Sequence, residues 1–355
     1  MLLTKIDIER FRCLESAQLE FNPRCNVIVG TNGSGKTSLL EAVFLLGSGH
    51  SFRSHQTNTL LQHGADSFQV VGKVGGTLTL DVLGVLGRSD SREFWVNGRA
   101  VRSAAELAIR LPVQVIDPEV HRLIEDGPNR RRQFFDWGVF HVEPQFHDAW
   151  RRYSRALRQR NAALRNSGGA SSCHIWDQEI IEQGIKVANF RDRYLEALKP
   201  FVCELSEKLI GSEVVIEHQR GWRKDLEFEA ALMANRIRDA AQGNTSVGPH
   251  RADLVLKIAG AAIRDRISRG EQKMLACVLI LSQQLHRASI GAPPACLLLD
   301  DPAAELDVDN LGKLLSVVAQ IPAQLIVTTL STQAVQCLPT HRLFHVEHGN
   351  VKAVA

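Results

Sequence analysis

Long apolar runs are missing from this chain of 355 residues. The longest, such as 276–281 and 295–299, are far shorter than the roughly 20 residues that a membrane-spanning helix needs. The N-terminal residues alternate and already carry charges, which is not the pattern of a secretory signal peptide. We therefore expect a soluble, cytoplasmic protein with no membrane partner.

Cysteine pairs of the C-x-x-C type are also missing, although the chain has seven cysteines. This argues against a zinc site or a disulfide framework, and most of the cysteines lie in apolar surroundings, as reduced core cysteines do.

A strong excess of one charge is missing too, because 42 Lys and Arg against 39 Asp and Glu give a net charge of +3. Such a balance neither demands nor excludes a nucleic-acid partner, so the positions of the basic residues decide.

The pattern of apolar residues divides the chain into three parts. Residues 1–120 are typical of strands with one early helix, residues 121–240 are mainly helical with a Ser/Gly-rich loop at 166–172, and residues 241–355 return to strands and helices. There is no repeat of fixed period. We expect an α/β fold in which 1–120 and 241–355 form one nucleotide-binding head, split in sequence around a helical lid at 121–240.

A glycine-rich segment matches the phosphate-loop pattern G-x-x-x-x-G-K-[ST] at every fixed position; it reads Gly30-Thr31-Asn32-Gly33-Ser34-Gly35-Lys36-Thr37. Glycines let the backbone N–H groups converge on a phosphate, and the helix that follows adds its positive dipole end. Lys36 would reach the β- and γ-phosphates, and Thr37 would place a hydroxyl on Mg²⁺. A plain glycine-rich turn is the alternative, but an apolar strand before the loop and a helix after it favour ATP.

A second motif is acidic: Asp300 and Asp301 directly follow an apolar segment at 295–299, which is typical of a buried strand. Central parallel strands are continuous apolar runs, and ligand sites lie at their carboxyl ends. We predict that Asp300 holds Mg²⁺ through water and that Asp301 orients or deprotonates the attacking water. A turn or helix cap before Pro302 is the alternative, which the phosphate loop makes weaker.

Ser268-Arg269-Gly270-Glu271-Gln272 precedes a strong helix. Its ordinary interpretation is a capping box between Ser268 and Glu271. It also keeps the Ser and the second Gly of the ABC signature Leu-Ser-Gly-Gly-Gln, which faces the γ-phosphate held by the other subunit. One helix start can serve both roles, because a capped helix N-terminus is itself an anion site.

Two departures from the usual ABC pattern concern hydrolysis. Glu305-Leu306-Asp307 resembles the D-loop at the dimer seam, but the strand 324–328 is followed by Thr329 where most ABC proteins have His. Asp301 likewise stands where most have Glu. Thr329 can hydrogen-bond a phosphate or water but cannot carry charge as His does. Both features predict slow hydrolysis.

In this order and spacing the motifs resemble the RecF family over nearly the whole chain. The resemblance is carried by the phosphate loop with Leu40-Glu41-Ala42 and Ser51-Phe52-Arg53, by Ile8–Arg12, by Gly127-Pro128 with Arg130-Arg131-Arg132, by Val247-Gly248-Pro249-His250-Arg251, and by Leu299-Asp300-Asp301.

The resemblance implies an ABC-type head with a helical lid. It implies a homodimer that forms with ATP, binding to single- and double-stranded DNA, and cooperation with RecR and RecO in loading a recombinase at gaps. It also places Arg53 near the nucleotide. No Q-loop glutamine is identified: Gln114 is near the expected strand, but residues 117–119 occupy the expected turn, so this contact stays open.

An arginine-rich stretch at 150–165 contains no Asp or Glu. On a helix four of its arginines share one stripe, which could follow DNA phosphates; they are Arg151, Arg155, Arg158 and Arg165. A solvated helix face is the alternative, which the absence of acids weakens. A second candidate patch is Arg130, Arg131 and Arg132. Without interleaved aromatic residues we expect contact with the DNA backbone and no sequence preference.

Other functional classes remain as alternatives. The ATPase subunit of an ABC transporter would keep a switch His and needs no basic insert. An SMC-like chromosome ATPase would need long heptad arms between its halves, and no sustained heptads occur here. A purely structural DNA-binding protein would not need Lys36, Asp300 and Asp301 together.

Overall fold

A computed structural model describes residues 2–54, 56–76, 80–165, 173–258, 260–263, 267–304, 306–339 and 341–354. The chain folds as two compact units, one made of residues 1–120 with 277–355 and the other of residues 121–276. No helix in the described ranges is long and apolar enough to cross a bilayer. The predicted loop at 166–172 lies outside these ranges.

The first unit contains a mostly parallel sheet with the strand order β15-β14-β3-β13-β12-β8, in which only β15 runs antiparallel to its neighbour. The predicted apolar strands form its centre: every residue of β12 and β13 is buried, as expected for parallel strands covered on both faces. The strands are β3 (Cys25–Val29), β8 (Val113–Ile116), β12 (Cys296–Asp300), β13 (Gln324–Thr329), β14 (Arg342–Glu347) and β15 (Asn350–Val354).

A second sheet in this unit is antiparallel, with the order β2-β1-β4-β5-β6-β7. Strands β4 to β7 follow one another as a meander, and a hairpin turn at Asn97-Gly98, where both residues have positive φ, joins β6 to β7. Its strands are β1 (Leu2–Phe11), β2 (Leu14–Glu20), β4 (Ser67–Gly75), β5 (Leu80–Arg88), β6 (Arg92–Val96) and β7 (Arg99–Val101).

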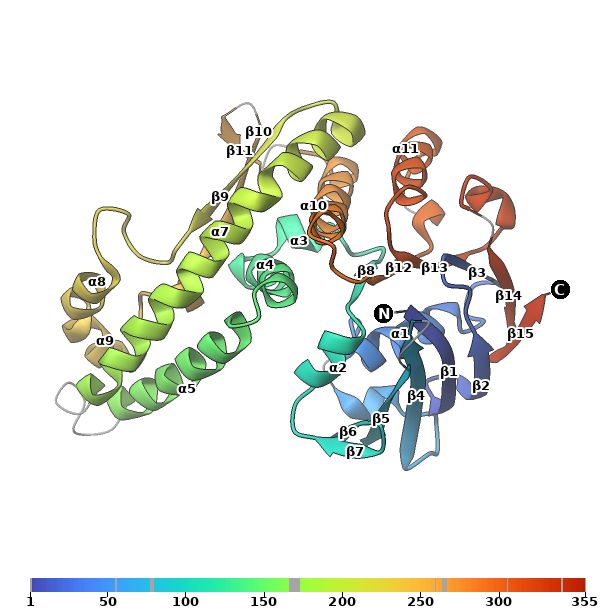
Figure 1. Cartoon of the computed structure of the whole chain (residues 1–355), viewed down its shortest axis with the longest axis horizontal. Coiled ribbons are helices and arrows are strands. Elements are labelled where there is room, and N and C mark those ends of the chain that lie inside the picture. Colours follow the sequence, from blue (N-terminus) through green and yellow to red (C-terminus); the bar gives the residue numbers. More distant parts are fainter. Residues whose placement is uncertain are drawn as a thin grey trace. The chain divides into compact units, whose positions relative to one another are not determined.

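Helix α1 (Lys36–Ser48) contacts strands of both sheets (Figure 1). Ten of its 13 residues are buried, so the helix that begins at the phosphate loop is fixed on several sides by one continuous hydrophobic core. It ends where Gly49 adopts φ 73°, the left-handed C-cap that glycine favours. The unit also contains α2 (Ala105–Arg110) and α11 (Val308–Val318).

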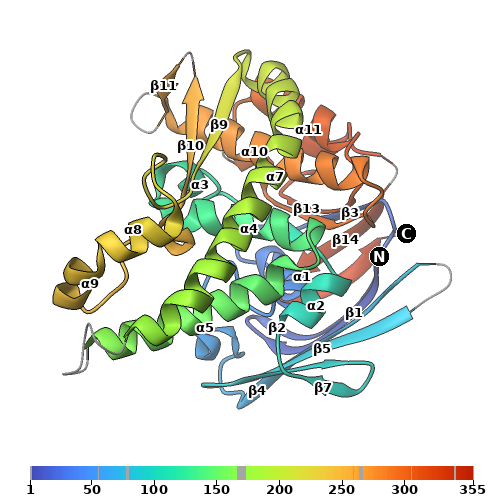
Figure 2. The same cartoon turned by 60° about the vertical axis from the view of Figure 1, so that its left-hand side comes forward.

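The second unit is mainly helical, as predicted, and its helices α5 and α7 lie side by side in both views (Figures 1 and 2). Its helices are α3 (Arg122–Glu125), α4 (Pro128–Val142), α5 (Phe146–Arg165), α7 (Asp177–Ile210), α8 (Phe228–Ala234) and α9 (Arg236–Gln242). Helix α10 (Arg269–Ser289) begins in this unit and ends in the first.

The second unit also contains a small sheet, whose strands are β9 (Val214–Gln219), β10 (Asp253–Ile258) and β11 (Ala261–Ala262). Strand β9 was not predicted, because its short run lies within a helical region. It pairs with β10 along its whole length. This pairing ties residues 241–276 to the helical unit, so the second boundary lies after Ala276 and differs from the one predicted at residue 240.

Candidate nucleotide-binding site

The predicted site residues of the first unit come together at one edge of the parallel sheet. Strands β3, β13 and β12 are parallel neighbours, and their register places Val29 opposite Thr329 and Thr328 opposite Asp300. The loop 30–37 and the acidic pair therefore follow the carboxyl ends of β3 and β12, on either side of β13, and such strand ends are where α/β sheets bind ligands.

The loop itself needs its glycines. A Cβ on Gly30 would lie 2.3 Å from the carbonyl oxygen of Val346, while Gly33 and Gly35 have φ values of 77° and 114°, which glycine adopts without strain. The Lys36 Nζ donates hydrogen bonds to the carbonyl oxygens of Gly30 (2.7 Å) and Thr31 (2.9 Å). The ammonium is thus held over the loop by backbone acceptors.

Thr37 and Asp300 are joined directly across the sheet edge. The Thr37 hydroxyl donates to Asp300 Oδ1 at 3.0 Å, and the Thr328 hydroxyl donates to the same oxygen at 2.7 Å. Thr328 was not singled out from the sequence. Its only signal there is its place next to Thr329 at a strand end, and the role of its hydroxyl becomes visible only through the pairing with Asp300.

Asp301 has an unusual backbone conformation and a side-chain oxygen without a hydrogen-bond partner among the described residues. Its φ is 45°, a left-handed value that Asp and Asn tolerate better than most residues, and its N–H donates to the Thr328 hydroxyl at 2.9 Å. Among the described residues its buried Oδ1 has no hydrogen-bond partner. Burial raises the pKa of the Asp301 carboxyl; Lys36 opposes that shift, and Asp300 adds to it.

The pKa of the lysine responds to the same surroundings. Burial lowers the pKa of the Lys36 ammonium, and the carboxylates of Asp301 and Asp300 oppose the change. Lys36, Asp300 and Asp301 therefore form one electrostatically linked set, as the sequence motifs predict.

A buried carboxylate on α1 organises the neighbouring arginines. Glu41 is fully buried and accepts two hydrogen bonds from Arg12, at 2.9 and 2.7 Å, and one from the Ser51 hydroxyl. The Arg53 guanidinium lies 3.7 Å from Glu41 and is about half exposed. Arg53 is thus placed beside α1, the helix that begins at the phosphate loop.

Other predicted positions that the structure describes have hydrogen-bond partners within the first unit. The Thr329 hydroxyl donates to the carbonyl oxygen of Ser331 at 3.0 Å. The Gln114 side chain donates to Gln283 at 2.7 Å and accepts from Gln284, so its amide is engaged with helix α10. Glu305 of the predicted D-loop lies outside the described residues, while Asp307 caps α11 by accepting from the N–H of Asn310.

The signature segment, in the second unit, forms the predicted capping box. The Ser268 N–H and hydroxyl donate to Glu271 Oε2 at 2.8 and 2.7 Å, and these bonds lower the pKa of the Glu271 carboxyl. Residues 268–271 are exposed. Ser268 and Gly270 are therefore accessible on the surface of their own unit.

The arginines of α5 separate into exposed and buried groups. Arg151, Arg155, Arg158 and Arg165 are exposed, although Arg151 pairs with Asp148. Within the described ranges Arg155 and Arg158 have no carboxylate in ion-pair range. Arg160 is fully buried, between Asp177 and Asp239.

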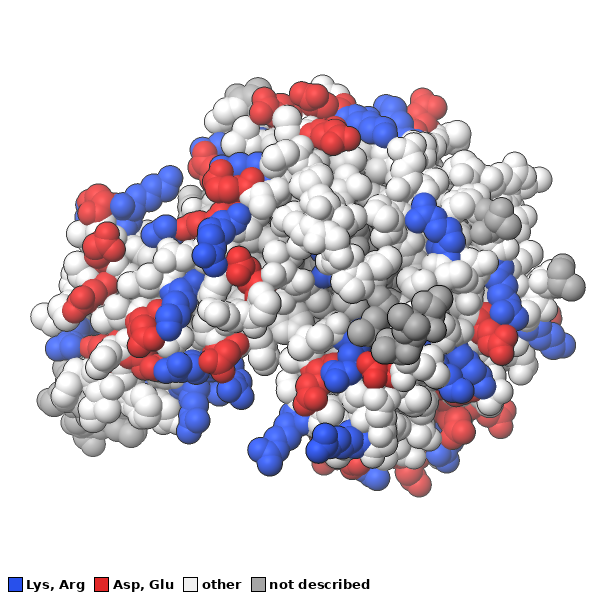
Figure 3. All heavy atoms as spheres, viewed as in Figure 1, with Lys and Arg blue, Asp and Glu red and all other residues white. Residues whose placement is uncertain are grey.

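The second candidate patch is only partly accessible: Arg130 is exposed and Arg132 is half-buried. Arg131 is buried and makes a two-bond ion pair with Asp253, while Arg130 pairs with Asp126. Acidic and basic side chains are mixed over the face of the molecule seen in Figure 3. The exposed arginines of α5 are therefore the stronger basic feature.

Comparison with known proteins identifies the family. The family model described as RecF/RecN/SMC N terminal domain matches residues 2–352. The DNA replication and repair protein RecF of Shewanella baltica is 38% identical over 365 residues, and the match covers 100% of both chains. The RecF of Vibrio parahaemolyticus is 34% identical over 358 residues, which cover 99% of this chain and 100% of that one.

Solved structures give the same result. The recombination mediator protein RecF-ATP of the RecFOR pathway has a TM-score of 0.88 at 25% identity and is covered to 98%, with 100% of this chain matched. An Smc head bound to the C-winged helix domain of ScpA has a TM-score of 0.62 at 17% identity, over 100% of this chain and 97% of that one, which shows a shared fold alone. The predicted ABC-type α/β head is confirmed, and this chain belongs to the RecF family.

Proposed function

We propose that this chain is a slow, DNA-dependent ATPase of recombinational repair, which binds ATP and Mg²⁺, dimerises on single- and double-stranded DNA and helps to load a recombinase at gaps. The observation that carries the proposal is the bonded set of Thr37, Asp300 and Thr328 beside Lys36 and Asp301. The similar structure described as RecF-ATP supports the binding of ATP. RecR and RecO are the partners suggested by the RecFOR pathway, to which that RecF belongs.

The residues of the loop fit a nucleoside triphosphate with Mg²⁺. The Ser34 hydroxyl and Asp301 Oδ1 are buried and, among the described residues, lack hydrogen-bond partners, and buried polar atoms normally have one. The backbone of residues 30–35 would hold the phosphates, and Thr37 with Asp300 would hold the metal. A bound Mg²⁺ would neutralise charge that develops on the phosphates.

Each side chain then has a definite task. Lys36 leaves its two backbone acceptors for the β- and γ-phosphates, as the lysine of such loops does. Thr328 keeps Asp300 oriented through its 2.7 Å hydrogen bond. Asp301 orients the attacking water and accepts its proton, since its carboxylate oxygen has no competing donor. Because Asp is one methylene shorter than Glu, and because Thr329 replaces a charged switch residue, turnover is slow.

Dimer formation gives a direct test. We expect a monomer without nucleotide and a mass twice as large in light scattering with ATP and Mg²⁺, because Ser268 and Gly270 face the γ-phosphate of a second copy. Ser268→Arg should leave the monomer folded and abolish the doubling. A chain that stays monomeric under all conditions contradicts this proposal.

DNA binding is carried by the exposed stripe of Arg151, Arg155, Arg158 and Arg165. Replacing Arg155 and Arg158 by Ala should weaken binding to all sequences and flatten the slope of log K against log salt by about two, since each phosphate contact on duplex DNA contributes about −0.9. Fluorescence anisotropy at several salt concentrations measures this. Arg88→Ala is the matched control, since Arg88 lies on β5 of the first unit and is paired with Glu93. An unchanged slope in the double variant would leave the stripe as a solvated face.

A further inference from the structure

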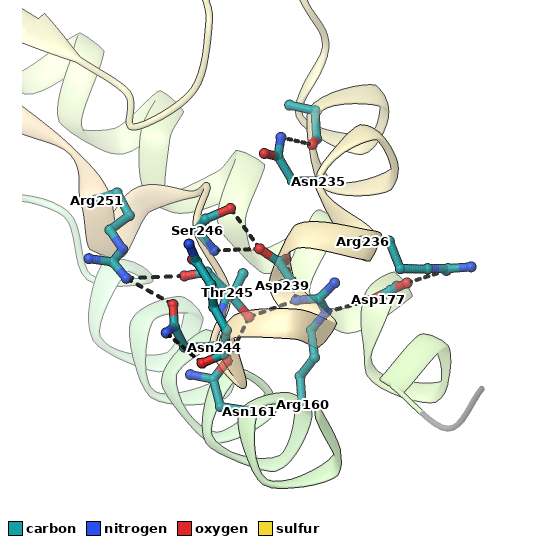
Figure 4. Close-up of polar contacts among 12 residues, drawn as sticks. Arg160, Asn161, Asp177, Asn235, Arg236, Asp239, Asn244, Thr245, Ser246 and Arg251 are labelled. Carbon is teal, nitrogen blue, oxygen red and sulfur yellow. Dashed lines mark hydrogen bonds and ion pairs between the residues drawn. The ribbon is translucent and has the colours of Figure 1, made fainter. Parts of the chain in front are cut away.

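A loop of the second unit contains the Gly-Pro-His-Arg sequence and has no role in the proposed ATPase. Its first half is fixed by buried ionic groups (Figure 4). Arg160 donates to Asp239 at 2.8 Å and to the Thr245 hydroxyl at 2.7 Å, and Asp239 accepts from the N–H (2.9 Å) and hydroxyl (2.6 Å) of Ser246. Arg160 and Asp239 are fully buried, so residues 244–246 have little freedom.

The second half of the loop is fixed by an uncharged network. His250 Nε2 lies 2.9 Å from the carbonyl oxygen of Thr245, so Nε2 carries the proton and Nδ1 accepts from the Tyr153 hydroxyl, at 2.6 Å. Burial lowers the pKa of His250 to about 4, which keeps the ring neutral at physiological pH. Arg191 donates to the carbonyl oxygen of Pro249 at 2.8 Å. Of the four motif residues, Arg251 is the exposed one.

Arg251 lies in an open pocket of about 780 Å³ beside the segment 220–227. The two loops are tied together, because the Gly248 N–H donates to Gly221 at 3.0 Å and a Cβ on Gly221 would lie 2.1 Å from the Gly248 oxygen. The lining includes the cations Arg220, Arg223, Lys224 and Arg251 and the acids Asp192 and Glu227.

The charge of this pocket favours an anionic ligand. Asp192 is already engaged by Arg220 and His218, and Arg223 pairs with Asp225. Among the described residues, Lys224 and Arg251 have no carboxylate in ion-pair range. Glu217, which also interacts with Lys224, is paired with Lys257. The positive charge that the pocket has to offer is therefore that of Lys224 and Arg251.

The pocket also adjoins the arginine stripe. Asn161 lies on α5 between Arg158 and Arg165, and its side-chain oxygen accepts from the N–H and hydroxyl of Thr245 at 2.8 and 2.7 Å. Arg251 in turn donates to Asn244 at 3.3 Å. The loop 244–251 therefore connects the helix face of the stripe to the pocket.

We propose that this pocket is a second binding point for DNA phosphates, at which the sugar–phosphate backbone that follows the α5 stripe is held by Lys224 and Arg251. The proposal rests on the proposed DNA binding. Trp222 supports backbone contact over base stacking, because its ring is stacked on Phe228 at 4.6 Å and the Arg220 guanidinium lies 6.0 Å from its centroid. Binding here is sequence-tolerant.

The test measures DNA affinity against salt by fluorescence anisotropy for the full chain with ATP and Mg²⁺. Lys224→Ala combined with Arg251→Gln should flatten the slope by about two, whereas Arg251→Lys, which keeps the charge, should retain it. Lys73→Ala, which removes an exposed lysine on β4 of the first unit, should change nothing. Lys224→Glu repeats the test without altering the loop 244–251.

The outcomes separate the two proposals. If the wild type binds DNA, if the stripe variant weakens that binding, and if the pocket variants keep the wild-type slope, the pocket proposal is overturned and the proposed function stands. If the wild type binds no DNA, both proposals fall. A third outcome is that the wild type binds poly-glutamate, whereas the pocket variants bind DNA normally but no longer bind poly-glutamate. The pocket then binds an acidic polypeptide, and the DNA assignment is overturned.

Discussion

Replacing Lys36 by Met should remove ATP turnover while leaving the fold intact. The ammonium is the cation that the phosphate loop supplies to the β- and γ-phosphates, and loss of one such preorganised charge costs at least about 10²–10³ in rate. The fold should survive because Met fills the space of the buried side chain. Two hydrogen bonds to the carbonyl oxygens of Gly30 and Thr31 are lost, but so is the cost of burying a charge, which already lowers the Lys36 pKa.

Three measurements check this expectation. Phosphate release gives turnover, and thermal unfolding with and without ATP gives binding, since a ligand that binds only the folded state stabilises it by about 2.7 kcal/mol at 100 times its Kd. The variant should melt near the wild type without nucleotide and gain nothing from ATP. Lys73→Met, which changes an exposed lysine on β4, is the matched control. Normal turnover in the Lys36 variant would move the nucleotide site elsewhere.

The sequence predicts the nucleotide site better than it predicts the second unit, for a physical reason. In the phosphate loop each residue is required by local geometry: Gly35 by its φ of 114°, Gly30 by the nearby backbone oxygen of Val346. The strands on either side are short, apolar and buried, so their pattern is unambiguous. Thr328 was not predicted because its hydrogen bond to Asp300 depends on the register between β12 and β13, which a single sequence does not give.

The second unit is harder because distant residues decide burial. Helical spacing correctly left Arg160 out of the exposed stripe, yet nothing in its neighbourhood shows that Asp177 and Asp239 neutralise it. Arg131 looked like part of a surface patch, and its partner Asp253 lies 122 positions further along the chain. Strand β9 was missed because it pairs with β10, beyond two intervening helices.

Asp301→Asn should slow hydrolysis by about 10²–10⁴, the usual contribution of a general base, and prolong the ATP-bound dimer. Asn keeps the shape and tolerates the φ of 45° at this position, so the backbone should not change. Asp300→Asn is the informative comparison, because it removes the acceptor shared by Thr37 and Thr328 and should weaken retention of Mg²⁺ and nucleotide. Turnover assays and nucleotide release distinguish the two variants.

The raised pKa of the Asp301 carboxyl adds two expectations with a defined sign. Wild-type turnover should fall as the pH drops through a value above the usual range of Asp, and Asp301→Asn should lose that acid limb. A carboxyl whose pKa is higher in the folded state than in the unfolded state destabilises the fold once it ionises. The nucleotide-free Asn variant should therefore melt above the wild type at neutral pH, and the difference should vanish below the pKa of the unfolded state. Unchanged turnover across this range would assign the base to another residue, whereas a lost acid limb together with the higher melting temperature ties both effects to the one carboxylate.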